Sequence, residues 1–65
     1  MNWRYITNRN INDTENCVVK EIHGSKQYTV QKVGRSLITI ANEYGFAQLI
    51  SRQVFKDCYV VEESE

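Results

Sequence analysis

The sequence predicts an all-β domain: a small antiparallel barrel of five or six strands, with one helical or 3₁₀ turn before the last strand. Residues 27–33, 36–42 and 46–50 are typical of three consecutive strands, rich in β-branched and aromatic side chains. Gly34 and Gly45 lie at the two ends of the middle segment, and hairpin turns favour glycine because they need positive φ. Closing such a sheet would remove its exposed edges.

The first two strands of this meander differ in their hydrophobic pattern. In residues 27–33, a strict alternation puts Tyr28, Val30 and Lys32 on one face and Thr29, Gln31 and Val33 on the other. Residues 37–41 are almost continuously apolar, as in a strand covered on both faces or in a short buried helix. The short run and its Ile and Thr residues, which lose side-chain freedom in a helix, favour the strand.

A short first strand is expected at residues 3–7, where polar and apolar residues alternate. Trp3 and Tyr5 fall on the same face of this strand. Two interpretations stay open: the pair seals one end of the barrel, or it is exposed and stacks on nucleic-acid bases or fills a pocket of a partner.

Residues 8–16 are the most loop-like part of the chain. The segment contains four asparagines, and Ile11 is its only strongly apolar residue. Asn and Asp side chains hydrogen-bond to nearby backbone and so favour turns. Nine residues are a long loop for so small a domain, and the segment is either a functional loop or an ordinary exposed connector.

A second strand is expected at residues 17–22, with a turn at residues 23–26 leading into the meander. His23, the only histidine, lies in this turn. With no second histidine and no cysteine near it in the sequence, His23 gives no metal site and has no partner for catalysis. The sequence has no carboxylate pair, catalytic triad or phosphate-binding loop, so we expect no enzymatic activity, no cofactor and no metal.

Residues 51–55 break the strand pattern. Ser51 is suited to cap a single helical or 3₁₀ turn, which would place Val54 and Phe55 under the sheet. A last strand is expected at residues 58–61. Residues 62–65 are then an acidic C-terminal tail, and residues 1–61 form one domain.

Length and charge limit what such a chain can do. A domain of 65 residues has a small core, so a homodimer, which would add buried surface, stays open. The net charge is zero, but all eight Lys and Arg lie in residues 1–56 with four acids, and the last nine residues carry the other four acids. Residues 1–56 therefore carry an excess of positive charge. This excess either favours binding to nucleic acid or to an acidic protein surface, or it belongs to an ordinary solvated surface.

The cysteines and the hydropathy pattern bear on the compartment. Cys17 and Cys58 form neither a CxxC motif nor a disulfide framework. The sequence has no signal peptide and no apolar run long enough to span a membrane. We therefore expect a cytoplasmic protein with reduced thiols and no membrane partner.

The segment Tyr28–Ile40, with its Val33-Gly34-Arg35 turn, resembles the small β-barrel proteins encoded by bacteriophages and other mobile elements. A bent sheet that closes through a 3₁₀ turn before a short last strand is similar to an SH3-like barrel. The resemblance covers residues 17–61 and rests on turns and strand rhythm. It implies an accessory protein that binds a host protein in the host cytoplasm and alters it. SH3 domains proper line their peptide groove with aromatics and a proline, and this chain has no proline.

The sequence therefore predicts a non-enzymatic binding module that inhibits or regulates a host protein. Its candidate contacts are exposed aromatic and arginine side chains, the types enriched at interface hot spots: Trp3, Tyr5, Arg35, Tyr44 and Arg52. The alternative is RNA or single-stranded DNA binding through Lys26, Tyr28, Lys32, Arg35 and Tyr44. A net charge of zero counts against this alternative, because phosphate binders are usually basic.

Overall fold

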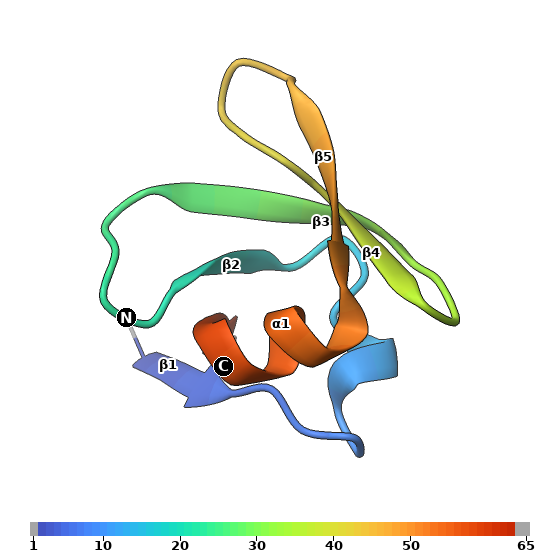
Figure 1. The fold of residues 1–65 in the computed structure, drawn as a ribbon. Helices are drawn as coiled ribbons and strands as arrows, with labels where there is room; N and C mark the ends of the chain where they lie inside the picture. The colour runs from blue at the N-terminus through green and yellow to red at the C-terminus, as the bar shows by residue number, and fades with distance from the viewer. Residues whose placement is uncertain (1, 64–65) are drawn as a thin grey trace.

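The computed structural model describes residues 2–63, which form six β-strands, one 3₁₀ turn and one α-helix (Figure 1). In chain order these are β1 (Asn2–Tyr5), η1 (Ile11–Asp13), β2 (Val18–Glu21), β3 (Gln27–Val33), β4 (Leu37–Ala41), β5 (Ala47–Ser51), α1 (Arg52–Cys58) and β6 (Tyr59–Glu63). The prediction of a small antiparallel β-sheet protein with one helix before the last strand is confirmed.

The strands form one sheet in the order β1-β6-β2-β3-β4-β5, and every neighbouring pair is antiparallel. Strands β2 to β5 are the predicted meander. Helix α1 then carries the chain from the β5 edge back to β6, which lies between β1 and β2. The predicted closure into a barrel is wrong for residues 2–63: β1 adds to the outer side of β6 and extends the sheet, so β1 and β5 remain its two edges.

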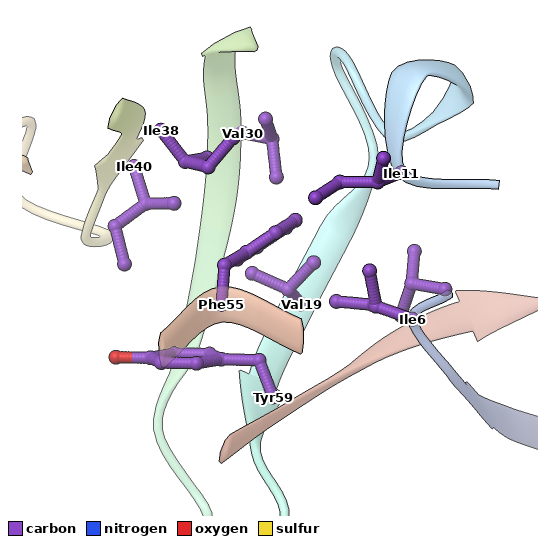
Figure 2. Packing of buried hydrophobic residues seen from close by; sticks show 9 residues of the cluster. Ile6, Ile11, Val19, Val30, Ile38, Ile40, Phe55 and Tyr59 are labelled. Atoms are coloured by element: carbon purple, nitrogen blue, oxygen red, sulfur yellow. The ribbon is translucent and has the colours of Figure 1, made fainter. Parts of the chain in front are cut away.

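The core lies on one face of the bent sheet, where α1 and the segment around η1 cover it (Figure 2). Phe55 of α1 is fully buried at the centre of this cluster, against Val19, Ile38 and Ile40 of the strands. The other members of the cluster are Ile6, Ile11, Val30, Tyr59 and Val61. The rings of Phe55 and Tyr59 pack against each other in a tilted arrangement, with 5.9 Å between the ring centroids.

Helix α1 begins as predicted, at a Ser51 cap. The Ser51 Oγ accepts a hydrogen bond from the N–H of Val54 at 3.1 Å. The helix is longer than the single turn expected, and only Phe55 of the expected pair is buried, while Val54 is partly exposed. Successive helical residues point about 100° apart, so neighbours cannot both face the sheet.

The asparagine-rich segment is anchored to the core by two buried side chains, while most of its other residues are exposed. Ile11 of η1 is fully buried in the core cluster. The side chain of Thr14 is buried too and donates to the backbone oxygen of Ile11 at 2.7 Å. Asn10 accepts a hydrogen bond from the Thr7 N–H at 2.8 Å and donates to the Tyr5 oxygen at 3.1 Å, which fixes the turn after β1.

The segment rejoins the sheet at Asn16, which adopts the left-handed conformation with φ of 69°. Asparagine tolerates this region better than most residues because its side chain hydrogen-bonds locally. The Asn16 N–H donates to the Val30 oxygen at 2.8 Å, and the Val30 N–H donates to the Cys17 oxygen at 3.0 Å. These bonds align β2 with β3.

The two turn glycines serve different purposes. Gly45 has φ of +86°, as predicted for a hairpin turn. Gly34 does not use a positive φ, so that part of the prediction is wrong. A Cβ at position 34 would lie 2.7 Å from the Leu37 oxygen, and glycine is therefore needed for space. Its N–H donates to the same oxygen at 2.9 Å.

A β-bulge in β3 breaks the alternation predicted for residues 27–33. Val30 pairs with Ile40, but Lys32 pairs with Thr39, so Gln31 is an extra residue on this strand. Beyond the bulge the faces exchange. Val33 packs against the core, and Lys32 is exposed, whereas strict alternation placed Lys32 on the same face as Val30.

The last strand continues past the expected end of the domain at residue 61. Glu62 and Glu63 belong to β6 and lie opposite Trp3 and Asn2 of β1. The rest of the predicted acidic tail, residues 64 and 65, lies outside the described residues.

We expect Phe55→Ala to destabilise the fold by about 3–5 kcal/mol, because it removes a fully buried aromatic side chain and leaves a cavity. Urea unfolding followed by circular dichroism measures the change. Val54→Ala, one residue earlier in the same helix and partly exposed, is the matched control and should change stability by less than about 0.5 kcal/mol. Equal losses in the two variants would contradict the central role of Phe55.

Candidate functional site on the outer face

The outer face is the side of the sheet that points away from the core. Directly opposed residues of neighbouring strands share a face, so the strand registers define its composition. One row of the outer face crosses all six strands, and its members are Trp3, Glu62, Val18, Thr29, Ala41 and Ala47. The middle of this row consists of small side chains.

A hollow of about 510 Å³ lies over the small side chains of this row. Val18, Thr29 and Ala41 form its floor. The loop between β2 and β3 borders it with Ser25 and Lys26, and the β4–β5 hairpin borders it with Asn42, Glu43 and Tyr44. The hollow is thus bordered by two turns, with short side chains between them.

The hairpin wall of the hollow is rigidly built. The side-chain oxygen Oδ1 of Asn42 accepts hydrogen bonds from the N–H groups of Tyr44 at 2.9 Å and Phe46 at 3.0 Å. The Asn42 N–H donates to the Phe46 oxygen at 3.0 Å, which closes the turn around Gly45. The Tyr44 side chain is 77% exposed on this fixed backbone. The backbone that carries this exposed aromatic ring is thus fixed beside the hollow.

The lining offers binding groups of mixed character. Lys26 and Glu43 provide one positive and one negative charge, and the remaining polar groups are amides and hydroxyls of Ser25, Gln27, Thr29 and Asn42. Tyr28 also borders the hollow, but its ring packs edge-on against Tyr59 with 6.3 Å between the ring centroids. Tyr44 is therefore the aromatic side chain available to a ligand there.

The structure does not gather the five contact residues predicted from the sequence into one surface. Trp3 and Tyr5 lie on β1, at one edge of the sheet, and Tyr44 lies next to β5, at the other edge. The interpretation in which Trp3 and Tyr5 seal the end of a barrel is wrong, because both lie on the outer face. Trp3 is partly covered by Lys20, whose Nζ is 5.1 Å from the centroid of the indole ring, and Tyr5 is exposed.

Arg35 and Arg52 do lie close together, but only Arg35 presents its side chain at the surface. The Nη1 of Arg52 donates to the Gly34 oxygen at 2.7 Å, and its Nη2 reaches Asn12 Oδ1 at 3.5 Å. The Arg52 N–H also donates to the Ser36 oxygen at 3.1 Å. Arg52 therefore joins the β3–β4 turn, the η1 segment and α1, which is a structural task.

A second, smaller hollow of about 360 Å³ brings together residues that are far apart in the sequence. His23 and Glu21 border it from the end of β2, and Asp57 and Cys58 border it from the end of α1. The Ile22 N–H donates to the Cys58 oxygen at 2.9 Å and holds the two segments together. The fold thus brings His23 and Cys58, which are far apart in the sequence, to one hollow, but among residues 2–63 no cluster of His, Cys, Asp and Glu could hold a metal ion.

The phenol of Tyr59, next to this hollow in sequence, has a raised pKa. Burial raises the pKa of the Tyr59 phenol, and the carboxylate of Glu21, directly opposite in β2, raises it further. Tyr28 and Cys58 contribute in the same direction. The neutral phenol is therefore the form that the fold favours.

No protein-family model, no curated protein and no solved structure matches this chain. Between residues 2 and 63 no helix has the length and the apolar character that crossing a membrane would need.

We expect Arg52→Ala to lower the free energy of unfolding by roughly 1.5–3 kcal/mol, because the partly buried guanidinium loses a short, charge-assisted hydrogen bond to Gly34. Chemical denaturation measures the loss. Arg35→Ala is the control: it removes an exposed arginine from the neighbouring turn and should leave stability unchanged. A larger loss for Arg35→Ala than for Arg52→Ala would contradict this assignment.

We expect stability to decline at alkaline pH, partly through Tyr59. Because the pKa of Tyr59 is raised on folding, its contribution is complete below the unfolded-state pKa of about 10 and is lost as the pH rises through the folded-state pKa. Urea unfolding between about pH 9 and pH 11 should show a smaller decline for Tyr59→Phe than for the unmodified chain. Tyr44→Phe, at an exposed position, should show the full decline, and equal slopes for the two variants would refute the idea.

Proposed function

We propose that this chain is a non-enzymatic binding module that attaches to a protein through the hollow on its outer face. The observation that carries the proposal is the exposed ring of Tyr44, which extends from a backbone fixed by the Asn42 turn beside a floor of small side chains. Tyrosine is enriched at interface hot spots because its ring covers a large area at low entropic cost. A rigid turn lowers that cost further, since little conformational freedom remains to be lost on binding.

The charge of the hollow favours a protein ligand. Lys26 and Glu43 balance each other at its rim, and the chain as a whole is neutral. A protein partner brings amides, hydroxyls and both signs of charge, which match such a lining. A phosphate backbone brings negative charge only, and Glu43 would repel it.

Nucleic-acid binding is the second candidate, and one observation favours it. The strand registers place Lys20 and Lys32 on the outer face, and Lys26 borders the hollow on the same side. Three lysines and an exposed tyrosine are the components of a surface that holds single-stranded RNA or DNA. Glu62 and Glu43 on the same face reduce its positive potential.

The wider context is also a proposal. We infer that the fold is a variant of the SH3-like barrel, opened by the addition of β1, and that the chain acts in the host cytoplasm as a phage or mobile-element protein that inhibits or regulates a host protein. The support is its small size, the helix directly before the last strand, and the turn pattern of residues 28–45.

The proposal is tested by capture from a bacterial lysate with quantitative mass spectrometry. Tagged wild-type chain should retain one protein in stoichiometric amount. Tyr44→Ala should weaken that interaction by about 30-fold or more, the effect of losing a hot-spot side chain worth about 2 kcal/mol.

Tyr5→Ala is the matched control, because it removes the same side chain, similarly exposed, from the opposite edge of the sheet. It should retain the partner as the wild type does. Equal loss in both variants, or no protein retained at all, would overturn the proposal. Retention of nucleic acid that is lost at high salt and depends on Lys26 would instead establish the second candidate.

A further inference from the structure

Strand β5 is an edge of the sheet that has none of the usual protection against pairing with another chain. Edge strands are commonly kept from pairing by charged side chains, proline or a bulge. Residues 44–51 form the longest uncharged stretch of the sequence, with no proline. The pairing of β5 with β4 is regular over all five residues, whereas the β3–β4 pair contains a bulge. The free side of β5 is thus an unbroken row of backbone donors and acceptors without charged side chains.

The opposite edge is different. Strand β1 has four residues, and one of them is the exposed Arg4. Two chains that paired through β1 would bring their Arg4 side chains to the same short ladder, where like charges repel. Among the two edges that the structure describes, only β5 is free of such an obstacle.

Exposed apolar side chains are concentrated beside the β5 edge. Residues 2–63 include six large hydrophobic residues that are exposed, and four of them fall in the eleven-residue segment around β5: Tyr44, Phe46, Leu49 and Val54. Leu49, at the centre of β5, is 63% exposed, and Phe46 in the hairpin is 73% exposed. The β4–β5 turn projects away from the rest of the fold (Figure 1), and the first three residues of β5, Ala47, Gln48 and Leu49, are exposed.

The β5 edge of one copy of the chain can pair with the β5 edge of a second copy. An antiparallel pair of β5 strands related by a two-fold axis at Leu49 would overlap over the whole strand, with Leu49 against Leu49 and Ala47 against Ser51 of the partner subunit. The small Ala47 and Ser51 leave room on both sides of the central leucines. In the same register Phe46 lies opposite Arg52 of the second chain, whose guanidinium is turned back to the Gly34 oxygen of its own chain.

We propose that the chain forms a two-fold symmetric homodimer through antiparallel pairing of its β5 strands, centred on Leu49. The two sheets then join into one continuous sheet of twelve strands. A second copy is the occupant that this edge fits best, because the strand is uncharged and the exposed Leu49 at its centre is flanked by the small Ala47 and Ser51. The inference uses the β5 edge and does not depend on what binds in the hollow.

The experiment is sedimentation equilibrium of the purified protein over a range of concentrations, with no other protein present. The wild type should show a reversible monomer–dimer equilibrium. Leu49→Lys places two positive charges next to each other at the two-fold axis and should weaken dimerisation by at least about tenfold. Circular dichroism should show that the variant is folded, since Leu49 is exposed in the monomer.

Two controls separate edge pairing from other modes of association. Tyr5→Lys adds the same charge at an exposed position of the other edge strand, and Leu37→Lys adds it on the outer face of β4. Both variants should dimerise as the wild type does. A wild type that stays monomeric at every concentration, a Leu49→Lys variant that dimerises normally, or a Leu37→Lys variant that dissociates equally would overturn the proposal.

The register has its own test. At the two-fold axis the Cα atoms of residue 49 would lie about 4.5–5.5 Å apart, within the range that a disulfide spans. Mild oxidation of Leu49→Cys should therefore link position 49 of one chain to position 49 of the other, as identified by peptide mapping. Tyr5→Cys should give no such symmetric link. A dimer in which position 49 stays reduced would overturn this register.

Discussion

The burial of Phe55 against the curved sheet is the contact on which the rest of the structure depends. A sheet of six short strands has one face to cover, and residues 2–63 form no second sheet that could cover it. Helix α1 supplies one fully buried aromatic ring, and η1 supplies Ile11 beside it. The Ser51 cap sets where the helix begins and therefore which residue faces the sheet. Arg52, the first residue of this helix, then hydrogen-bonds to the β3–β4 turn and to the η1 segment. These bonds connect the helix that covers the sheet to both neighbouring segments.

Local features of the fold could be read from the sequence, because each depends on neighbouring residues. The strands of the meander, the positive φ of Gly45 and the Ser51 cap are of this kind. Features set by distant partners could not be read in this way. The alternation of residues 27–33 fails at Gln31, because the bulge depends on how β4 pairs with β3. The sheet stays open because β1 pairs with β6 and not with β5. This strand order depends on packing between residues that are far apart in the sequence.

The same distinction explains what was missed at the candidate site. Residue type alone suggested five contacts, but strand order separates Trp3 and Tyr5 from Tyr44, and the hydrogen bonds of Arg52 make it a structural residue. The hollow depends on a row of small side chains contributed by three strands, and a single strand does not reveal it. Two signals were present in the sequence. Ile11 is the only strongly apolar residue of a polar segment. Residues 44–51 are the longest uncharged stretch of the whole sequence.

The β4–β5 hairpin connects the two proposals physically. Its Asn42 turn fixes Tyr44 beside the hollow and also sets the start of β5 through the N–H of Phe46. Pairing at the β5 edge uses the backbone on one side of this hairpin, and the hollow uses its other side, towards β3. A dimer would therefore leave both hollows open while it held both hairpins in place. Two identical sites on one rigid sheet bind a partner that carries repeated sites with greater avidity than a single site does. Loss of dimerisation would then weaken binding to such a partner even when every residue of the hollow is intact.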